Sequence, residues 1–192
     1  MKQQEKIGRE LYETLKALVG VVVAVTLVFT FAARLFRVSG GSMRHTLQSG
    51  DQLLVVNRPL CGELERGDIV IISKESFRDG EPIVKRVIAT GGETVDIDFE
   101  AGVVYVDGEA LAEPYTREPT YQEEGLKFPV TLGEEEIFVM GDNRNDSSDS
   151  RHSDIGCVDL RNVMGKAVAL ILPGKTAETE QREWGRIGLL NG

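Results

Sequence analysis

The distribution of hydrophobic and polar residues divides the chain into three parts. Residues 1–16 carry several charged side chains at helical spacing, whereas residues 17–33 contain no charged side chain and are rich in Val, Leu and Phe. After Asp51 the pattern changes to short apolar runs separated by turn residues. This pattern predicts a short charged tail, one long apolar helix and a β-rich domain.

The apolar run predicts a membrane-spanning helix over residues 17–36. With Arg34 able to extend its charge to the lipid surface, the run approaches the ~20 residues that a bilayer requires. A cleaved signal peptide and a buried core helix are the alternatives. A signal peptide has an apolar region of only about 7–15 residues that ends in a small-x-small site, for which Thr30-Phe31-Ala32 is a poor match. A core helix would carry a polar stripe, which this run lacks. Positive residues flank both ends, so charge does not predict the orientation.

The remainder, residues 37–192, predicts a mainly antiparallel β fold, because many strands follow one another with no helical periodicity between them. Residues 113–133 differ, since they are rich in Glu, Pro, Thr and Tyr, and we expect an irregular insertion or small lobe at about residues 96–134. The predicted strands are Leu53–Val56, Ile69–Ile72, Ile83–Ile88, Thr94–Ile97, Val103–Val106, Ile137–Met140 and Val163–Leu172.

Composition narrows the classes of function. The 192 residues are 41% hydrophobic, enough for a folded core, and the net charge of −9 argues against a nucleic-acid partner, which needs a basic face. Two cysteines, Cys61 and Cys157, do not make a disulfide framework. They either pair or remain small buried hydrophobes, and we expect the second. Neither belongs to a zinc-binding pattern, and we expect no metal or cofactor.

Ser42 is the candidate nucleophile, because it follows Gly40 and Gly41 on a turn close to the end of the apolar run. A serine hydroxyl needs a neighbouring base. The chain has two histidines. His45 lies on the same turn, in an awkward position for a base, and His152 lies between Ser and Asp residues that are adjacent in sequence and rarely converge on one nucleophile. A Ser-His-Asp triad is therefore disfavoured.

Lys85 is the candidate base. Alternation along a strand places Ile83, Lys85 and Val87 on one face, so that aliphatic side chains flank the amine. Apolar surroundings disfavour the charged form of lysine. Arg86 on the opposite face cannot deprotonate and would need a carboxylate partner. The alternative is that both side chains extend into solvent at a strand edge.

A third polar stretch, residues 139–151, follows a predicted strand. Its alternating Asp and Asn residues suggest a calcium loop, but Arg144 stands where a ligand would be and no Glu follows at EF-hand spacing. A hydrogen-bonded loop that holds catalytic groups is favoured instead, with Asp149 available to Arg86 or Arg151.

Three segments together resemble the type I signal peptidases, serine proteases with a Ser/Lys dyad, in their single-span form. They are Gly41-Ser42-Met43 with Thr46-Leu47 and Gly50-Asp51; Gly67-Asp68-Ile69-Val70 with Val84-Lys85-Arg86-Val87-Ile88 and Gly91-Gly92; and Gly141-Asp142-Asn143-Arg144 with Ser147 and Asp149-Ser150-Arg151. The similarity covers about residues 38–172. It implies a barrel-like antiparallel fold, shared with the SOS repressors, behind one N-terminal transmembrane helix.

The resemblance implies that Ser42 is the nucleophile and Lys85 the general base, with no cofactor or metal. It also implies that Ser147 hydrogen-bonds to and orients the lysine, while Arg86, Asp149 and Arg151 hold the surrounding loops. The oxyanion hole would use the backbone N–H of Ser42 and a backbone donor at Gly40. His45 departs from the proline that the family usually has at this position, which leaves the details of substrate positioning open.

The resemblance also implies a cytoplasmic tail over residues 1–16 and a β domain on the extracytoplasmic face. From Ala33 to Ser42 the chain reaches at most about 30 Å, which keeps the serine near the bilayer. The expected partners are the lipid bilayer and secretory pre-proteins with small residues before the cut. Their signal peptides would bind as an extended strand beside Ile83 and Val84, with Met43 as a wall of the pockets.

Two other functions remain as alternatives. A self-cleaving regulator of the SOS-repressor type would share the Ser/Lys dyad and the β fold, but it would carry a DNA-binding head in place of the apolar run. In a non-catalytic, membrane-tethered β module, Ser42 and Lys85 would be ordinary surface residues.

Overall fold

The structure is a computed structural model that describes residues 2–175 and 181–190. The chain forms two compact units, Met1–Arg34 and Leu35–Gly192. The first unit is helix α1 (Lys2–Leu27), continued by a π-helical segment at Val28–Ala32. Within it, Lys6–Ala32 is long and apolar enough to cross a membrane. The helix begins at Lys2, so that it includes the charged tail, and it ends four residues before the predicted residue 36, because Ala33–Arg37 form strand β1.

The second unit is built from antiparallel strands, and all seven predicted strands are present, with ends within one residue of the prediction. They are β2 (Gln52–Asn57), β3 (Ile69–Ile72), β4 (Ile83–Ala89), β5 (Thr94–Asp98), β6 (Val103–Val106), β9 (Glu136–Met140) and β11 (Val163–Leu172). The strands that the sequence did not predict are β1 and four strands of two residues each, namely β7 (Glu109–Ala110), β8 (Val130–Thr131), β10 (Val158–Asp159) and β12 (Gly188–Leu189).

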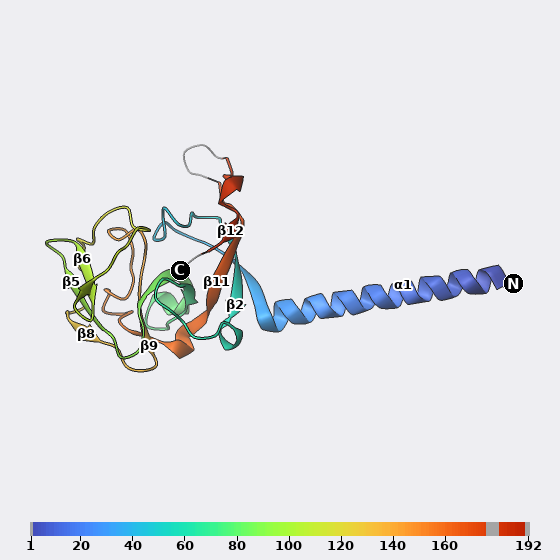
Figure 1. The fold of residues 1–192 in the computed structure, drawn as a ribbon, viewed down its shortest axis with the longest axis horizontal. Helices are drawn as coiled ribbons and strands as arrows, with labels where there is room; N and C mark the ends of the chain where they lie inside the picture. The colour runs from blue at the N-terminus through green and yellow to red at the C-terminus, as the bar shows by residue number, and fades with distance from the viewer. Residues whose placement is uncertain (1, 176–180, 191–192) are drawn as a thin grey trace. The chain divides into compact units, whose positions relative to one another are not determined.

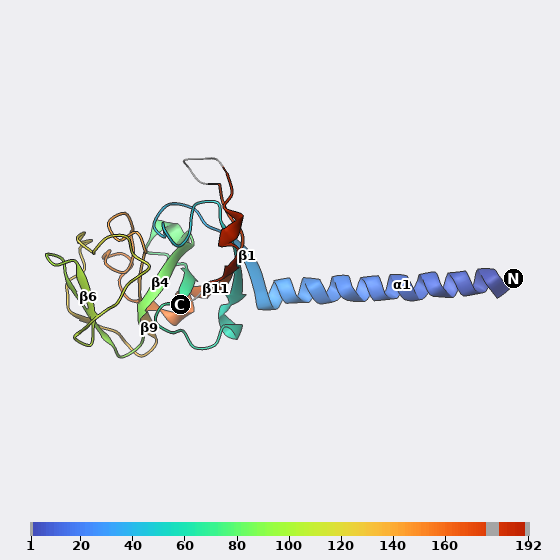
Figure 2. The same cartoon turned by 45° about the horizontal axis from the view of Figure 1, so that its top comes forward.

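The main sheet has the strand order β1-β2-β11-β3-β4-β9-β10, with β12 paired to β11. A second sheet has the order β7-β6-β5-β8. Figures 1 and 2 both show the labelled strands of the second sheet at the opposite side of the β domain from β11, with β9 between them. Residues Ile88, Ala89, Phe138 and Met140 of the main sheet form one apolar core with Val95, Val104 and the neighbouring buried residues of the second sheet. The second sheet is therefore packed into the β domain.

The segment from Glu113 to Gly133 is irregular, as predicted, apart from the two residues of β8. The two cysteines are free and partly buried. Cys157 packs against the core shared by the two sheets.

Candidate active site

Ser42 lies on a loop between β1 and β2 that is closed at its base. The Val38 N–H donates to the Asp51 carbonyl, and the Gly50 N–H donates to the Val38 carbonyl, both at 2.8 Å. On either side of the turn, Met43 and Leu47 are buried in the core at 2% and 0% exposure. These apolar anchors fix the loop and leave Ser42, directly before Met43, on the wall of a cavity.

Two residues of this loop have left-handed backbone conformations. Gly40 has φ +87°, which glycine adopts without strain, and no atom lies within 4 Å of where a Cβ would stand. His45 also has φ +87°. The proline ring fixes φ near −65°, so the backbone at His45 excludes the proline that the resemblance led us to expect at this position.

The C-terminal segment holds the same loop from the other side. Arg186 pairs with the fully buried Asp51 at 2.7 Å and donates to the Thr46 carbonyl at 3.1 Å. Asp51 also accepts the backbone N–H groups of Gln48 and Gly174. This contact was not predicted from the sequence, because 135 positions separate the two charges.

Lys85 lies in β4, next to Val70 of β3. Val70, Ile83 and Val87 belong to one apolar cluster, as the alternation along the strand predicted. The lysine side chain is 3% exposed. Burial lowers the pKa of Lys85 from 10.5 to about 8, against the opposing charges of Asp149 and Glu124, while Arg78 and Arg151 add to the lowering.

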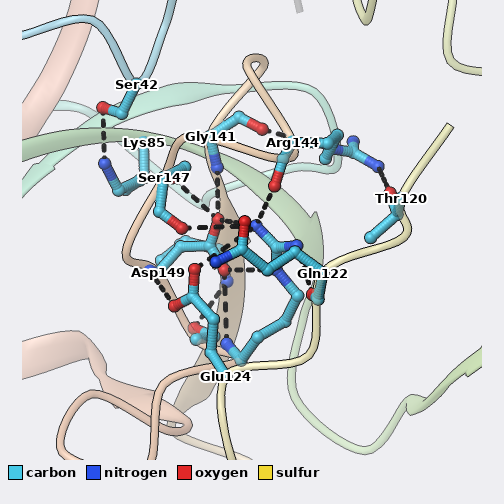
Figure 3. A network of polar contacts seen from close by, with 12 residues as sticks. Ser42, Lys85, Thr120, Gln122, Glu124, Gly141, Arg144, Ser147 and Asp149 are labelled. Atoms are coloured by element: carbon cyan, nitrogen blue, oxygen red, sulfur yellow. Dashed lines mark hydrogen bonds and ion pairs between the residues drawn. The ribbon is translucent and has the colours of Figure 1, made fainter. Parts of the chain in front are cut away.

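The two candidate catalytic groups meet. Lys85 Nζ lies 2.7 Å from Ser42 Oγ, across 43 positions of sequence (Figure 3). Both residues line a cavity of about 460 Å³, and the predicted substrate-contacting residues Met43, Ile83 and Val84 also line it. A hydroxyl that contacts a buried amine with a lowered pKa is the arrangement that a Ser/Lys hydrolase needs.

Arg86 finds its counter-charge in Asp142, not in Asp149. Met140, the last residue of β9, pairs with Arg86 of β4, so the chain beyond β9 brings Asp142 alongside. Arg86 Nε and Nη2 donate to the two oxygens of this carboxylate at 2.9 and 2.8 Å, and Nη1 donates to the Gly67 carbonyl at 2.7 Å. Asp142 also accepts the Thr46 hydroxyl, which links this ion pair to the Ser42 loop.

Asp149 pairs with Arg151, the second of its two predicted partners. Arg151 Nε and Nη2 donate to its carboxylate at 2.8 and 2.9 Å. Asp149 also accepts the Gly141 N–H at 2.9 Å and the Ser147 hydroxyl at 2.8 Å (Figure 3). Ser147 was predicted to hydrogen-bond to Lys85, but its hydroxyl donates to Asp149, and within the described residues the hydrogen bond of Lys85 Nζ goes to Ser42 Oγ. Burial favours the neutral form of Asp149, but the bonds from Arg151 and the backbone outweigh it and lower its pKa.

The segment 113–124 supplies site contacts that the sequence did not predict. Tyr115 lies over the Arg86 guanidinium, and Glu113 and Thr120 accept hydrogen bonds from Arg144 at 2.7 and 3.0 Å. The Gln122 carbonyl accepts a hydrogen bond from Arg151 at 2.9 Å. One acidic segment therefore contacts all three buried arginines of the site. The sequence signal that could have predicted these contacts is the high Glu content of this segment, because the predicted site contains several arginines that need acidic partners.

No group of three or more His, Cys, Asp or Glu side chains that could hold a metal occurs among the residues the structure describes. In the Asp/Asn-rich loop, the carboxylates of Asp142 and Asp149 instead pair with arginine side chains. The expectation of a metal-free site stays a prediction.

The chain is similar to known proteins over most of its length. Residues 11–172 match the family model described as signal peptidase, peptidase S26. The chain is 36% identical to signal peptidase I of Bacillus licheniformis over 171 residues, 85% of this chain and 89% of that protein. It is 35% identical to signal peptidase I T of Bacillus subtilis (strain 168) over 167 residues, 82% and 83% of the two chains. A crystal structure of a signal peptidase I from Enterococcus faecalis V583 aligns with a TM-score of 0.44 and 31% identity, over 54% of this chain and 96% of that one.

Proposed function

Because the chain belongs to the peptidase S26 family of signal peptidases, we propose that Ser42 is the nucleophile and Lys85 the general base of its type I signal peptidase activity. The observation that carries this assignment is the 2.7 Å contact between Ser42 Oγ and the nitrogen of a lysine that is 3% exposed. Above the lowered pKa of about 8, most Lys85 side chains are neutral and hold a lone pair for the serine proton.

In the proposed reaction Lys85 takes the Ser42 proton while Oγ attacks the scissile carbonyl carbon. The tetrahedral intermediate collapses, the C–N bond breaks, and the lysine ammonium gives its proton to the leaving amine. Water then attacks the acyl-serine carbonyl carbon while the neutral lysine takes a proton from it. The second tetrahedral intermediate collapses, the bond to Ser42 Oγ breaks, and the lysine ammonium returns its proton to Oγ as the new carboxyl end leaves. Two backbone donors would hold the oxyanion: the Ser42 N–H, which has no acceptor within the described residues, and the N–H at the left-handed Gly40.

The substrate would add a strand to a free edge of the main sheet. Strand β9 pairs with β4 only at Arg86–Ala89, so Ile83, Val84 and Lys85 have β3 on one side and no strand of the described chain on the other. This edge and residues 38–41 border the cavity. An extended peptide in this position would present its backbone to β4 and alternate side chains to Met43 and Val84, in pockets that favour small residues before the cut.

The substrates are the signal peptides of secretory pre-proteins, and members of the family are membrane-associated. We place the tail in the cytoplasm and the β domain on the outer face, because the cleavage site of a signal peptide lies on the outer side of its own apolar helix. Protease added to intact spheroplasts tests this orientation, since it should digest the β domain and spare an N-terminal tag. Protection of the β domain would contradict the orientation.

The full chain in detergent, incubated with a purified pre-protein, tests the catalytic assignment. Ser42→Ala and Lys85→Ala should each lose cleavage, while Ser76→Ala and Lys127→Ala, at exposed positions that do not line the cavity, should retain it. Cutting of its own chain alone would favour the self-cleaving regulator, and no cutting by the wild type would favour the non-catalytic module. Activity in either of the first two variants would contradict the dyad.

A further inference from the structure

Glu124 is a partly buried acid of segment 113–124 that borders the same cavity as the proposed dyad. Its side chain is 8% exposed and lines the same cavity as Ser42 and Lys85. Glu124 Oε2 accepts the Asp149 N–H at 3.3 Å, and Oε1 lies 3.9 Å from Arg151 Nη2 (Figure 3). The acid therefore contacts the Asp149–Arg151 pair and also borders the cavity.

The backbone beside Glu124 fixes its position. The Leu126 N–H donates to the Arg151 carbonyl at 2.9 Å, and Gly125 forms a β-bridge with His152. Gly125 has φ +94°, a left-handed conformation that turns the chain directly after the acid. The carboxylate is thus held in place by contacts to the loop that carries Asp149 and Arg151.

The charges around Lys85 come from four side chains. Asp149 and Glu124 favour its ammonium form, whereas Arg78 and Arg151 disfavour it. Asp149 is compensated directly, because Arg151 donates to it at 2.8 Å. Glu124 is 3.9 Å from the same guanidinium, and burial together with the charge of Asp149 raises its pKa, although the charges of Arg151 and His152 oppose this rise. It is the less compensated of the two carboxylates.

We propose that Glu124 is a positioning residue whose carboxylate sets the pH range in which Lys85 acts as a base. The proposal rests on the assignment of Lys85 as the general base. A negative charge near an amine stabilises its protonated form, so the Glu124 carboxylate raises the pH at which Lys85 becomes neutral and can act as a base. The same carboxylate accepts the Asp149 N–H and so helps to fix the loop that carries Asp149. The acidic insertion would then regulate the chemistry of the site as well as complete its packing.

Glu124→Gln separates these two roles, because the amide keeps an oxygen for the Asp149 N–H and loses the charge. We expect the rise of kcat/KM with pH to move to lower pH by at least about half a unit, which is roughly threefold more activity below the rise. Glu123→Gln is the matched control, since Glu123 is the exposed neighbour and the net charge changes equally. Its profile should superimpose on that of the wild type.

A profile of Glu124→Gln that superimposes on the wild type, or one that moves to higher pH, overturns the proposal. If Glu124→Gln turns over too slowly to measure, the pH dependence of Lys85 labelling by an amine-reactive reagent, followed by mass spectrometry in a Ser42→Ala background, gives the same test. There the labelling midpoint should fall with Glu124→Gln and stay constant with Glu123→Gln. Failure of the dyad itself would look different, because Lys85→Ala would then remain active.

Discussion

The guanidinium of Arg86 lies over the ring of Tyr115, with 4.1 Å between Arg86 Cζ and the ring centroid. Arg86 directly follows the proposed base in β4, and it also donates to Asp142, the Gly67 carbonyl and the Thr46 hydroxyl. The Tyr115 hydroxyl in turn donates to Glu113 at 3.2 Å, and Glu113 holds Arg144. The strand that carries Lys85 is thus fixed by a residue of the insertion.

Tyr115→Leu should lower both stability and turnover. Loss of a cation–π contact and of a large ring costs about 1–2 kcal/mol, which corresponds to a Tm lower by roughly 2–6 °C for a domain of this size. Because Tyr115 does not line the cavity, kcat should fall while KM stays nearly constant. Thermal unfolding and steady-state kinetics check both effects. Tyr115→Phe keeps the ring, and Tyr121→Leu removes a tyrosine that is 53% exposed, so both should resemble the wild type. A fully active, fully stable Tyr115→Leu would contradict this role.

Much of the fold followed from local sequence pattern. The strands that alternate or form short buried runs, such as Ile69–Ile72 and Val103–Val106, were predicted with correct bounds because both signals depend on neighbouring residues alone. Strand β1 was assigned to the apolar helix instead, since Leu35 and Phe36 continue its hydrophobicity and only pairing within the sheet makes them extended. Two-residue strands such as β12 depend on distant partners and leave no pattern.

In the candidate site, too, local sequence pattern predicted some features, whereas others depend on tertiary contacts. Lys85 could be predicted because strand alternation gives its neighbours, and a buried lysine has few roles. The partners of the arginines could not be assigned, because any buried carboxylate can satisfy a guanidinium and the choice depends on tertiary approach. Arg86 takes Asp142 since β4 and β9 are paired, and Arg151 takes Asp149, two residues away. Glu113 and Glu124 lie in the irregular segment between β7 and β8, and no local sequence pattern predicts where such a segment packs.

Cleavage should depend on pH through Lys85. The pKa of about 8 predicts that the logarithm of kcat/KM rises by one per pH unit below pH 8 and becomes constant above it, because only the neutral amine accepts the serine proton. Lys85→Arg should remain inactive throughout, since a guanidinium does not deprotonate in this range. Initial rates on a signal-peptide substrate between about pH 6 and 9 provide the measurement. Activity that is constant over this range would exclude the lysine as the titrating base.

The same burial should make Lys85 costly for stability. The unfolded lysine holds its proton up to about 10.5, whereas the folded one releases it near 8, so folding stability rises with pH between these values and carries the full penalty below 8. Lys85→Met should therefore have a free energy of unfolding about 1–3 kcal/mol higher than the wild type at neutral pH, and a higher Tm. This gain should vanish as the pH approaches 10. Thermal melts of both proteins across this range check the sign. A destabilised Lys85→Met at pH 7 would mean that the amine is not penalised by burial.

Gly141 provides a steric test of the site, because it sits where the end of β9 meets both the nucleophile loop and the Asp149 network. A Cβ at this position would overlap Ser147 Oγ and lie 2.5 Å from the Ser42 carbonyl oxygen, so neither group could keep its place. Since misplacement of reacting groups by about 1 Å can reduce rates by 10²-fold, Gly141→Ala should lower kcat/KM by at least about 100-fold. Gly185→Ala is the control, because nothing lies within 4 Å of its Cβ position. Kinetics on folded protein, verified by circular dichroism, decide the outcome. A Gly141→Ala enzyme within a few-fold of the wild type would show that the contact between Gly141 and Ser42 does not position the nucleophile.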